Sequence, residues 1–308
     1  MTTGRSDRRG FTLVELLISM VVGLVVLGAS LSFATTTFRT IQGNQVRGGV
    51  QKAARFIGMS LERDLQSTGV GLASTPSFGS LAVWGDTIVI LGVAYAPTES
   101  PPYDLNPPPG ASNPLAPGGT CGASCLDLVY PGMTFDLAAG DVARLQVNDE
   151  RRLIQVQGVA SGSGNAILEF TGAASVLNYG AGFSGGLLLD RFSTFVQKLS
   201  TVVYWVEDGK LMRAQSLRSD GSLDGAVMAY GVQEWTVTVT FRDGDQANRI
   251  DPADTDVTND FDDVVGLRVH AVLAADRPVQ HVAGGSLFTR TYDWRFGPRN
   301  LMYERNRL

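Results

Sequence analysis

Two hydrophobic patterns follow one another in the N-terminal part of the chain. The first is continuous: from Gly10 to Phe38 the only ionisable residue is Glu15. A helix from Phe11 to Phe33 would measure about 34 Å at 1.5 Å per residue, which is enough to cross the hydrocarbon layer of a bilayer. The pattern therefore predicts a transmembrane helix segment over residues 11–38.

The second pattern is periodic and continues the same helix. Apolar residues recur every three or four positions and charged residues fall between them, as in an amphipathic helix with one buried face. The prediction is an amphipathic helix over residues 39–69, outside the membrane, that ends near Gly69 or Gly71. Its apolar positions are Val46, Val50, Ala54, Ile57, Leu61 and Leu65.

Five glycines before residue 50 interrupt this predicted rod, and each costs up to about 1 kcal/mol relative to alanine in a helix interior. They favour either local bending of the rod or close packing of neighbouring helices against it. These glycines are Gly23, Gly28, Gly43, Gly48 and Gly49.

Beyond residue 80 the hydrophobic period changes to two, the period of half-buried strands. In the segment 234–241 the apolar positions 235, 237, 239 and 241 alternate with threonines, and Asp208-Gly209 predicts a tight hairpin turn. Helices and strands do not alternate, so the predicted class is α+β: a long N-terminal helix packed on a mostly antiparallel β body, residues 70–308. Predicted strands cover residues 87–93, 126–130, 142–147, 153–159, 166–170, 187–192, 201–206, 210–214, 234–241, 264–273 and 288–296.

Charge and composition restrict the class of protein further. Arg5, Arg8 and Arg9 outweigh Asp7, which by the positive-inside rule puts the N-terminus in the cytoplasm and the body outside. A mean hydropathy of +0.06 is too low for a polytopic membrane protein. A net charge of -5 and a pI of about 5.1 argue against a general nucleic-acid-binding surface.

Glu15 is unusual because a carboxylate inside a membrane helix costs about 2.5 to 3.5 kcal/mol. Cleavage between Gly10 and Phe11 would create an amine one helical turn away on the same face, where the carboxylate could pair with it. Alternatively, Glu15 reaches the cytoplasmic headgroups, since it lies within two turns of the helix start. A third interpretation, a signal peptide cleaved after Ala34, fits less well because its apolar core would be too long and contain a carboxylate.

The residues RRGFTLVELLISMVVGLVVL resemble the type IV prepilin signal, which type IV pilins and the pseudopilins of type II secretion share. The resemblance implies that residues 1–10 are a leader, that a prepilin peptidase cuts after Gly10, and that Phe11 becomes N-methylated. It also implies that Glu15 neutralises the amine of a neighbouring subunit as the protein leaves the bilayer for a filament.

Three later segments resemble PilW-type minor pilins and the related J-type minor pseudopilins: MAYGVQEWTVTVTF, VVGLRVHAVLA and RTYDWRFGPRNLMYERNRL. This implies an inner-membrane protein with a single-pass helix and a periplasmic body that later joins a filament at the cell surface. Its implied partners are other major and minor pilins, the prepilin peptidase and the inner-membrane assembly platform. The chain's length favours the PilW type, and residues 75–190 carry no resemblance.

A proline-rich segment, residues 97–118, is predicted to be an irregular surface loop. Cys121 and Cys125 follow it, and in an exported chain two nearby thiols suggest a small disulfide. A zinc site is not expected, because it would need two ligands besides these cysteines and the chain has only two histidines, His270 and His281.

The glycine-rich stretch NYGAGFSGG contains both GxSxG and GxGxxG. Both a nucleophile elbow and a dinucleotide-binding turn must be followed by a helix, whereas the residues that follow here are predicted to form a strand. Neither site therefore fits. The acidic loop 242–263 offers oxygen ligands for Ca²⁺ without the glycine of an EF-hand, so a solvated loop is favoured. We therefore expect no enzymatic activity and no cofactor. The calcium candidates are Asp243, Asp245, Asp254 and Asp256.

Overall fold

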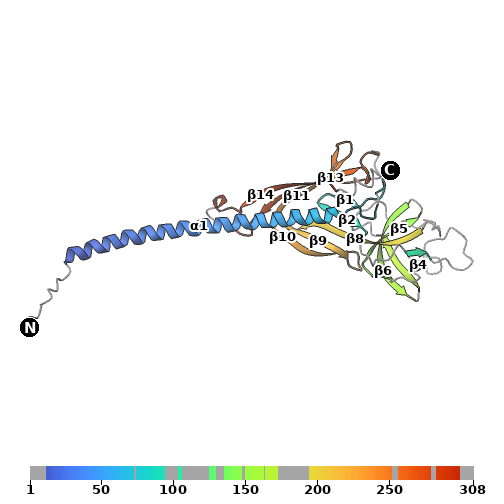
Figure 1. Cartoon of the computed structure of the whole chain (residues 1–308), viewed down its shortest axis with the longest axis horizontal. Coiled ribbons are helices and arrows are strands. Elements are labelled where there is room, and N and C mark those ends of the chain that lie inside the picture. The colour runs from blue at the N-terminus through green and yellow to red at the C-terminus, as the bar shows by residue number, and fades with distance from the viewer. Residues whose placement is uncertain are drawn as a thin grey trace, which may run out of the picture. The chain divides into compact units, whose positions relative to one another are not determined.

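The computed structural model describes residues 12–72, 74–93, 103–105, 125–129, 135–147, 150–162, 164–172, 194–251, 256–278 and 282–298 (Figure 1). The chain divides into two compact units. The first unit comprises Met1–Gln51 and Ala275–Phe288, and the second comprises Lys52–Ala274 and Thr289–Leu308.

A single helix, α1, spans Leu13–Gln66, as the two hydrophobic patterns predict. It is α-helical through all five glycines, so these residues do not break it. Each predicted apolar position of the amphipathic segment is at most 7% exposed. The helix ends at Gln66, and in the turn that follows Gly69 and Gly71 adopt φ values of 77° and 65°, a left-handed conformation that glycine reaches without steric cost.

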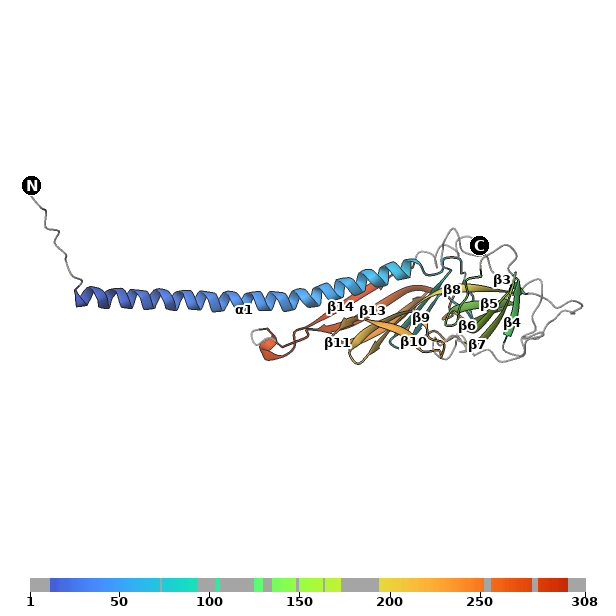
Figure 2. The same ribbon diagram turned by 90° about the horizontal axis from the view of Figure 1, so that it is seen from below.

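A four-stranded antiparallel sheet in the second unit has the order β12-β11-β13-β14. Its strands are β11 Val232–Phe241, β12 Gln246–Ala247, β13 Val264–Ala274 and β14 Thr289–Phe296. The predicted alternation in β11 is confirmed, because Trp235, Val237, Val239 and Phe241 are buried. The last turns of α1 run along this sheet (Figure 2). Helix and strand approach closely at Gly58, where a Cβ atom would lie 2.6 Å from Nε1 of Trp294.

A second sheet contains ten strands in the described part of the chain. Its strands β8 Thr194–Glu207 and β9 Lys210–Leu217 form the predicted hairpin, with Asp208 and Gly209 at φ values of 50° and 69°. The others are β1 Leu81–Trp84, β2 Thr87–Gly92, β3 Tyr103–Leu105, β4 Cys125–Val129, β5 Val142–Val147, β6 Glu150–Ser161, β7 Asn165–Gly172 and β10 Leu223–Tyr230.

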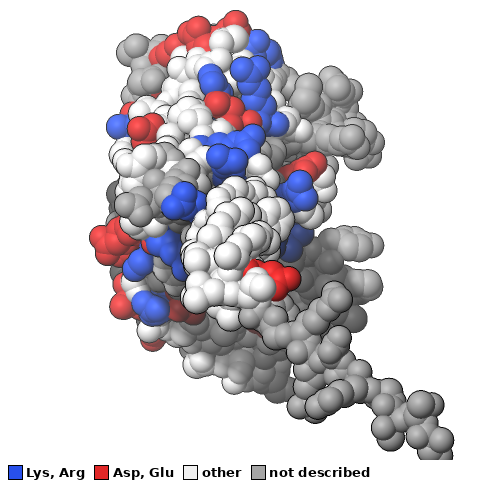
Figure 3. All heavy atoms as spheres, turned by 90° about the vertical axis from the view of Figure 1, so that its left-hand side faces the viewer, with Lys and Arg blue, Asp and Glu red and all other residues white. Residues whose placement is uncertain are grey.

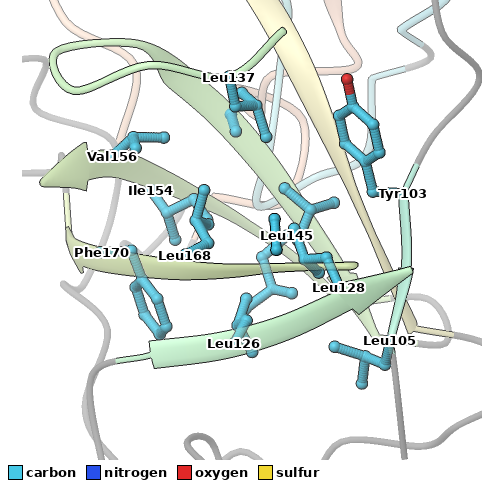
Figure 4. Close-up of a cluster of buried hydrophobic side chains, with 13 residues drawn as sticks. Tyr103, Leu105, Leu126, Leu128, Leu137, Leu145, Ile154, Val156, Leu168 and Phe170 are labelled. Carbon is cyan, nitrogen blue, oxygen red and sulfur yellow. The ribbon is translucent and has the colours of Figure 1, made fainter. Parts of the chain in front are cut away.

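Six of these ten strands close into a barrel. The ring runs β8-β3-β4-β7-β6-β5 and returns to β8, because β5 pairs with β8 from Val142↔Leu199 to Val147↔Thr194. Every neighbouring pair is antiparallel. Aliphatic side chains, with Tyr103 and Phe170, converge between the strands (Figure 4). Because these side chains pack on one another, the described barrel has a hydrophobic core.

The chain crosses from the ten-stranded to the four-stranded sheet at Gly231, between β10 and β11. Gly231 has a φ of 77°, and a Cβ atom there would lie 2.3 Å from the carbonyl oxygen of Ala274. Its own carbonyl accepts a hydrogen bond from the amide of Ala274 at 2.7 Å. The position therefore requires glycine on both conformational and steric grounds.

Four strands were not predicted from the hydrophobic pattern: β1, β3, β10 and β12. Strand β3 lies within the proline-rich segment 97–118 that was expected to be an irregular surface loop. Tyr103 in β3 is 2% exposed and its hydroxyl donates to Oδ1 of Asp136 at 2.6 Å. This part of the segment belongs to the barrel, and the other residues of 97–118 lie outside the described residues. The predicted strand 187–192 also lies outside them.

Candidate functional site

The first half of α1 exposes its apolar side chains in every direction. Large hydrophobic residues from Leu13 to Leu27 are 53–79% exposed, and the most apolar window of the helix, with a mean hydropathy of 2.4, is 0% buried by the rest of the protein. Seen end-on, the start of α1 is almost entirely uncharged (Figure 3). By length and composition this helix could cross a membrane. A helix that is apolar all round requires lipid or other helices around it.

Glu15 forms a reciprocal cap with Thr12 at the start of α1. The Glu15 amide donates to Oγ1 of Thr12 at 3.3 Å, while the Thr12 amide and hydroxyl both donate to Oε2 of Glu15 at 3.1 Å. This is the capping box of Ser/Thr-x-x-Glu, which satisfies backbone donors that the first turn leaves free. The sequence analysis missed this role, although Thr12-Leu13-Val14-Glu15 carries the signature.

The other residues of the predicted N-terminal site cannot be placed. Gly10 and Phe11 lie outside the described residues, as does the stretch NYGAGFSGG. Cys125 opens β4 and is disulfide-bonded, whereas Cys121, the only other cysteine in the chain, lies outside the described residues. His281 is also outside them. Of the predicted N-terminal site, the structure therefore describes Glu15 but not the Phe11 amine with which it is predicted to pair.

The acidic loop uses its carboxylates to fix its own turns. Oδ2 of Asp243 accepts from the Thr258 hydroxyl at 2.8 Å, and its Oδ1 accepts from the Asp245 amide at 2.9 Å. Asp256 accepts from both the hydroxyl and the amide of Thr258, and these bonds lower the pKa of its carboxyl group. Asp254 lies outside the described residues, within which no cluster of metal-ligating side chains is found.

We expect calcium to leave the thermal stability of the protein unchanged, because a ligand stabilises only when it binds the native state. The measurement is the melting temperature with calcium and with a chelator. The matched variant carries Asp243→Ala and Asp245→Ala. A calcium-dependent rise in melting temperature that this double variant loses would show that the loop is a calcium site.

A buried polar network holds the last turn of α1 on the ten-stranded sheet. Asp64 is 6% exposed, and its Oδ2 accepts from the Tyr204 hydroxyl of β8 at 2.5 Å. The same oxygen lies 2.8 Å from Nε and 2.7 Å from Nη2 of Arg213 on β9. Arg63 approaches the other carboxylate oxygen at 3.1 Å. The network therefore connects one helical residue to two neighbouring strands.

Burial is the main cause that raises the pKa of Tyr204, and the hydrogen bond to Asp64 raises it further. Tyr204 thus stays protonated and donates. Burial by itself would lower the pKa of Arg213, but its hydrogen bonds to Asp64 and Tyr204 raise it overall. Sequence analysis did not single out Asp64, although it lies seven residues after Ile57 and therefore on the apolar face of the helix.

His270 is half-buried in β13. Its Nδ1 lies 3.1 Å from Oδ1 of Asp293 on β14, which also accepts from Arg268 at 2.9 Å. The hydrogen bond with His270 lowers the pKa of Asp293 most, and the hydrogen bond from Arg268 lowers it further. The cluster links two neighbouring strands through side chains that are 34–42% exposed.

Comparison with protein families finds a match at the N-terminus. A family model, the prokaryotic N-terminal methylation motif, matches residues 5–31. The N-terminal segment is therefore similar to that of type IV prepilins. The match contains the RRGF junction, Glu15 and most of the exposed apolar half of α1. No curated protein and no solved structure gives a significant match to the chain. The prepilin-like motif and the exposed apolar helix together fit anchoring in the inner membrane.

Proposed function

We propose that the protein is a minor type IV pilin of the PilW type, a structural subunit with no enzymatic activity that helps to initiate or assemble the filament. This proposal depends on one observation: the N-terminal methylation motif at residues 5–31 coincides with a helix whose first half exposes its apolar surface. In the other unit, the last turns of the same helix hold a folded β body through Asp64. A membrane-anchored subunit that exchanges lipid for neighbouring helices needs both properties.

In this proposal the prepilin peptidase removes residues 1–10 and Phe11 receives an N-methyl group. The apolar segment then passes from the bilayer into a filament core, where neighbouring pilins replace the lipid. Glu15 pairs with the Phe11 amine of a neighbouring subunit. Its carboxylate is bonded only to Thr12, one turn away, within the described residues. Exchanging this local cap for an ammonium partner would leave the interior of the helix unchanged.

A minor pseudopilin of type II secretion is the second candidate, because both groups share the N-terminal motif. Deletion of the gene separates them: loss of surface filaments supports the pilin, and loss of exoprotein release with intact filaments supports the pseudopilin.

The third candidate is a membrane-anchored periplasmic hydrolase or binding protein. Retention of residues 1–10 in the mature protein would favour it.

We expect the mature chain to begin at N-methylated Phe11, as measured by mass spectrometry of the intact protein. Gly10→Glu should abolish processing, because the peptidase site must admit a small residue beside the scissile bond. Gly4→Glu is the matched control, since it adds the same charge to the leader away from the junction and should be processed. An unprocessed Met1 chain in assembled filaments would contradict the proposal.

A further inference from the structure

The segment between β13 and β14 packs on α1 close to the end of the apolar span. We call its described residues, 275–278 and 282–288, the basal loop. Its base is closed by a hydrogen bond from the Ala275 amide to the Phe288 carbonyl at 2.8 Å. Val282 is 6% exposed, and a Cβ atom at Gly43 of α1 would lie 3.2 Å from it. One turn later, the Arg47 guanidinium lies 6.0 Å from the centre of the Phe288 ring.

The height of this contact above the membrane follows from the helical rise. Phe38 is the last residue of the predicted transmembrane segment, and Gly43 lies five residues later, about 7 Å along the axis. The hydrocarbon core is about 30 Å thick and the whole bilayer about 40–45 Å, which leaves roughly 5–7 Å of headgroups on each side. The basal loop therefore contacts α1 just beyond the outer end of the apolar segment, close to the headgroup layer.

The exposed groups at this level suit an anionic surface. Arg39 and Arg47 of α1 and Arg277 of the loop are exposed, against one described acidic residue, Asp276. Residues 284–287 are exposed, and Leu287 offers an apolar side chain that is 37% accessible. A Cβ atom at Gly284 or Gly285 would meet no other atom within 4 Å, so the tip of the loop is open. Basic residues with one apolar side chain are typical of a segment that binds the membrane interface.

We propose that the basal loop, with Arg39 and Arg47 of α1, is a docking surface for the anionic phospholipid headgroups on the periplasmic side of the membrane. The inference rests on the proposed anchoring of α1. The surface would hold the subunit at a fixed depth and rotation before it enters a filament, because the loop is seated on one face of the helix at Gly43. Extraction from the membrane would then break these headgroup contacts.

The test uses the full-length chain in vesicles of phosphatidylcholine, with or without phosphatidylglycerol, and the photocrosslinker benzoylphenylalanine at one position at a time. Leu24→benzoylphenylalanine places the crosslinker in the hydrocarbon layer and reports contact with lipid tails. Gln51→benzoylphenylalanine is exposed about 20 Å beyond Phe38 along the helix and reports the water above the headgroups. Leu287→benzoylphenylalanine reports the loop. Lipid adducts are counted by intact mass.

We expect lipid adducts at positions 24 and 287 and none at position 51, with adducts at position 287 enriched in phosphatidylglycerol. Adding Arg47→Gln and Arg277→Gln should remove this enrichment. Gly43→Leu, which displaces Val282, should reduce adducts at position 287 only. Lipid adducts at position 24 but none at 287 would overturn the inference while leaving the anchor intact. Absence of adducts at position 24 would instead refute the anchoring on which it rests.

Discussion

Replacing Glu15 with valine should improve insertion of the precursor into the membrane and yet reduce its incorporation into filaments. Insertion improves by about 2–3 kcal/mol because a charge leaves the hydrocarbon. Incorporation falls because the Phe11 ammonium of the neighbouring subunit loses its partner, and breaking a buried pair costs about 3–5 kcal/mol. The measurement is piliation of a strain whose only copy carries Glu15→Val, with membrane level and Phe11 processing checked by blot.

Two further variants separate charge pairing from the local roles of Glu15. Glutamine fits a capping box as well as glutamate, so capping predicts that Glu15→Gln is tolerated, whereas charge pairing predicts that it is not. Thr12→Ala removes the cap, at about 0.5–2 kcal/mol, and keeps the carboxylate. Charge pairing therefore predicts nearly normal piliation for Thr12→Ala. If Glu15 only reaches the headgroups, Glu15→Gln should be tolerated and Glu15→Val nearly so. Normal piliation of both Glu15 variants would refute charge pairing.

Asp64→Asn should destabilise the β body by about 3–5 kcal/mol, since it leaves the guanidinium of Arg213 without its buried counter-ion. The side chains of Asp64 and Arg213 are 7% and 18% exposed, so solvent compensates little for the loss. The measurement is the free energy of unfolding from urea titration of the full-length chain in detergent, followed by tryptophan fluorescence. Trp205 on β8 lies next to Tyr204 in the chain and reports this region.

The matched control is Asp224→Asn, because the Arg218–Asp224 pair has a similar distance, 2.9 Å, but both side chains are more than half exposed. Exposed pairs contribute about 0–1 kcal/mol, so this variant should be nearly neutral. Adding Arg213→Met to Asp64→Asn should restore part of the lost stability by removing the unpaired charge. Equal effects of Asp64→Asn and Asp224→Asn would show that the network does not hold the helix on the sheet.

The main features that depend on neighbours along the chain follow from the sequence. A continuous apolar run and a helical period predict α1 over residues 11–69, and the structure begins it two residues later and ends it three residues earlier. Strict alternation predicts β11, because side chains on a strand point to opposite faces in turn. The prepilin-like motif at residues 5–31 is likewise a local feature of the sequence.

Only the tertiary structure decided which distant segments meet. Strand β3 has three residues among prolines, too few to show any period, and it is a strand because β4 and β8 pair with it on both sides. The barrel closes through the pairing of β5 with β8, about fifty residues apart in the chain. Asp64 meets Tyr204 and Arg213 across 140 and 149 residues. A burial pattern along α1 shows that one face is covered, but not which polar side chains of the sheet will lie opposite it.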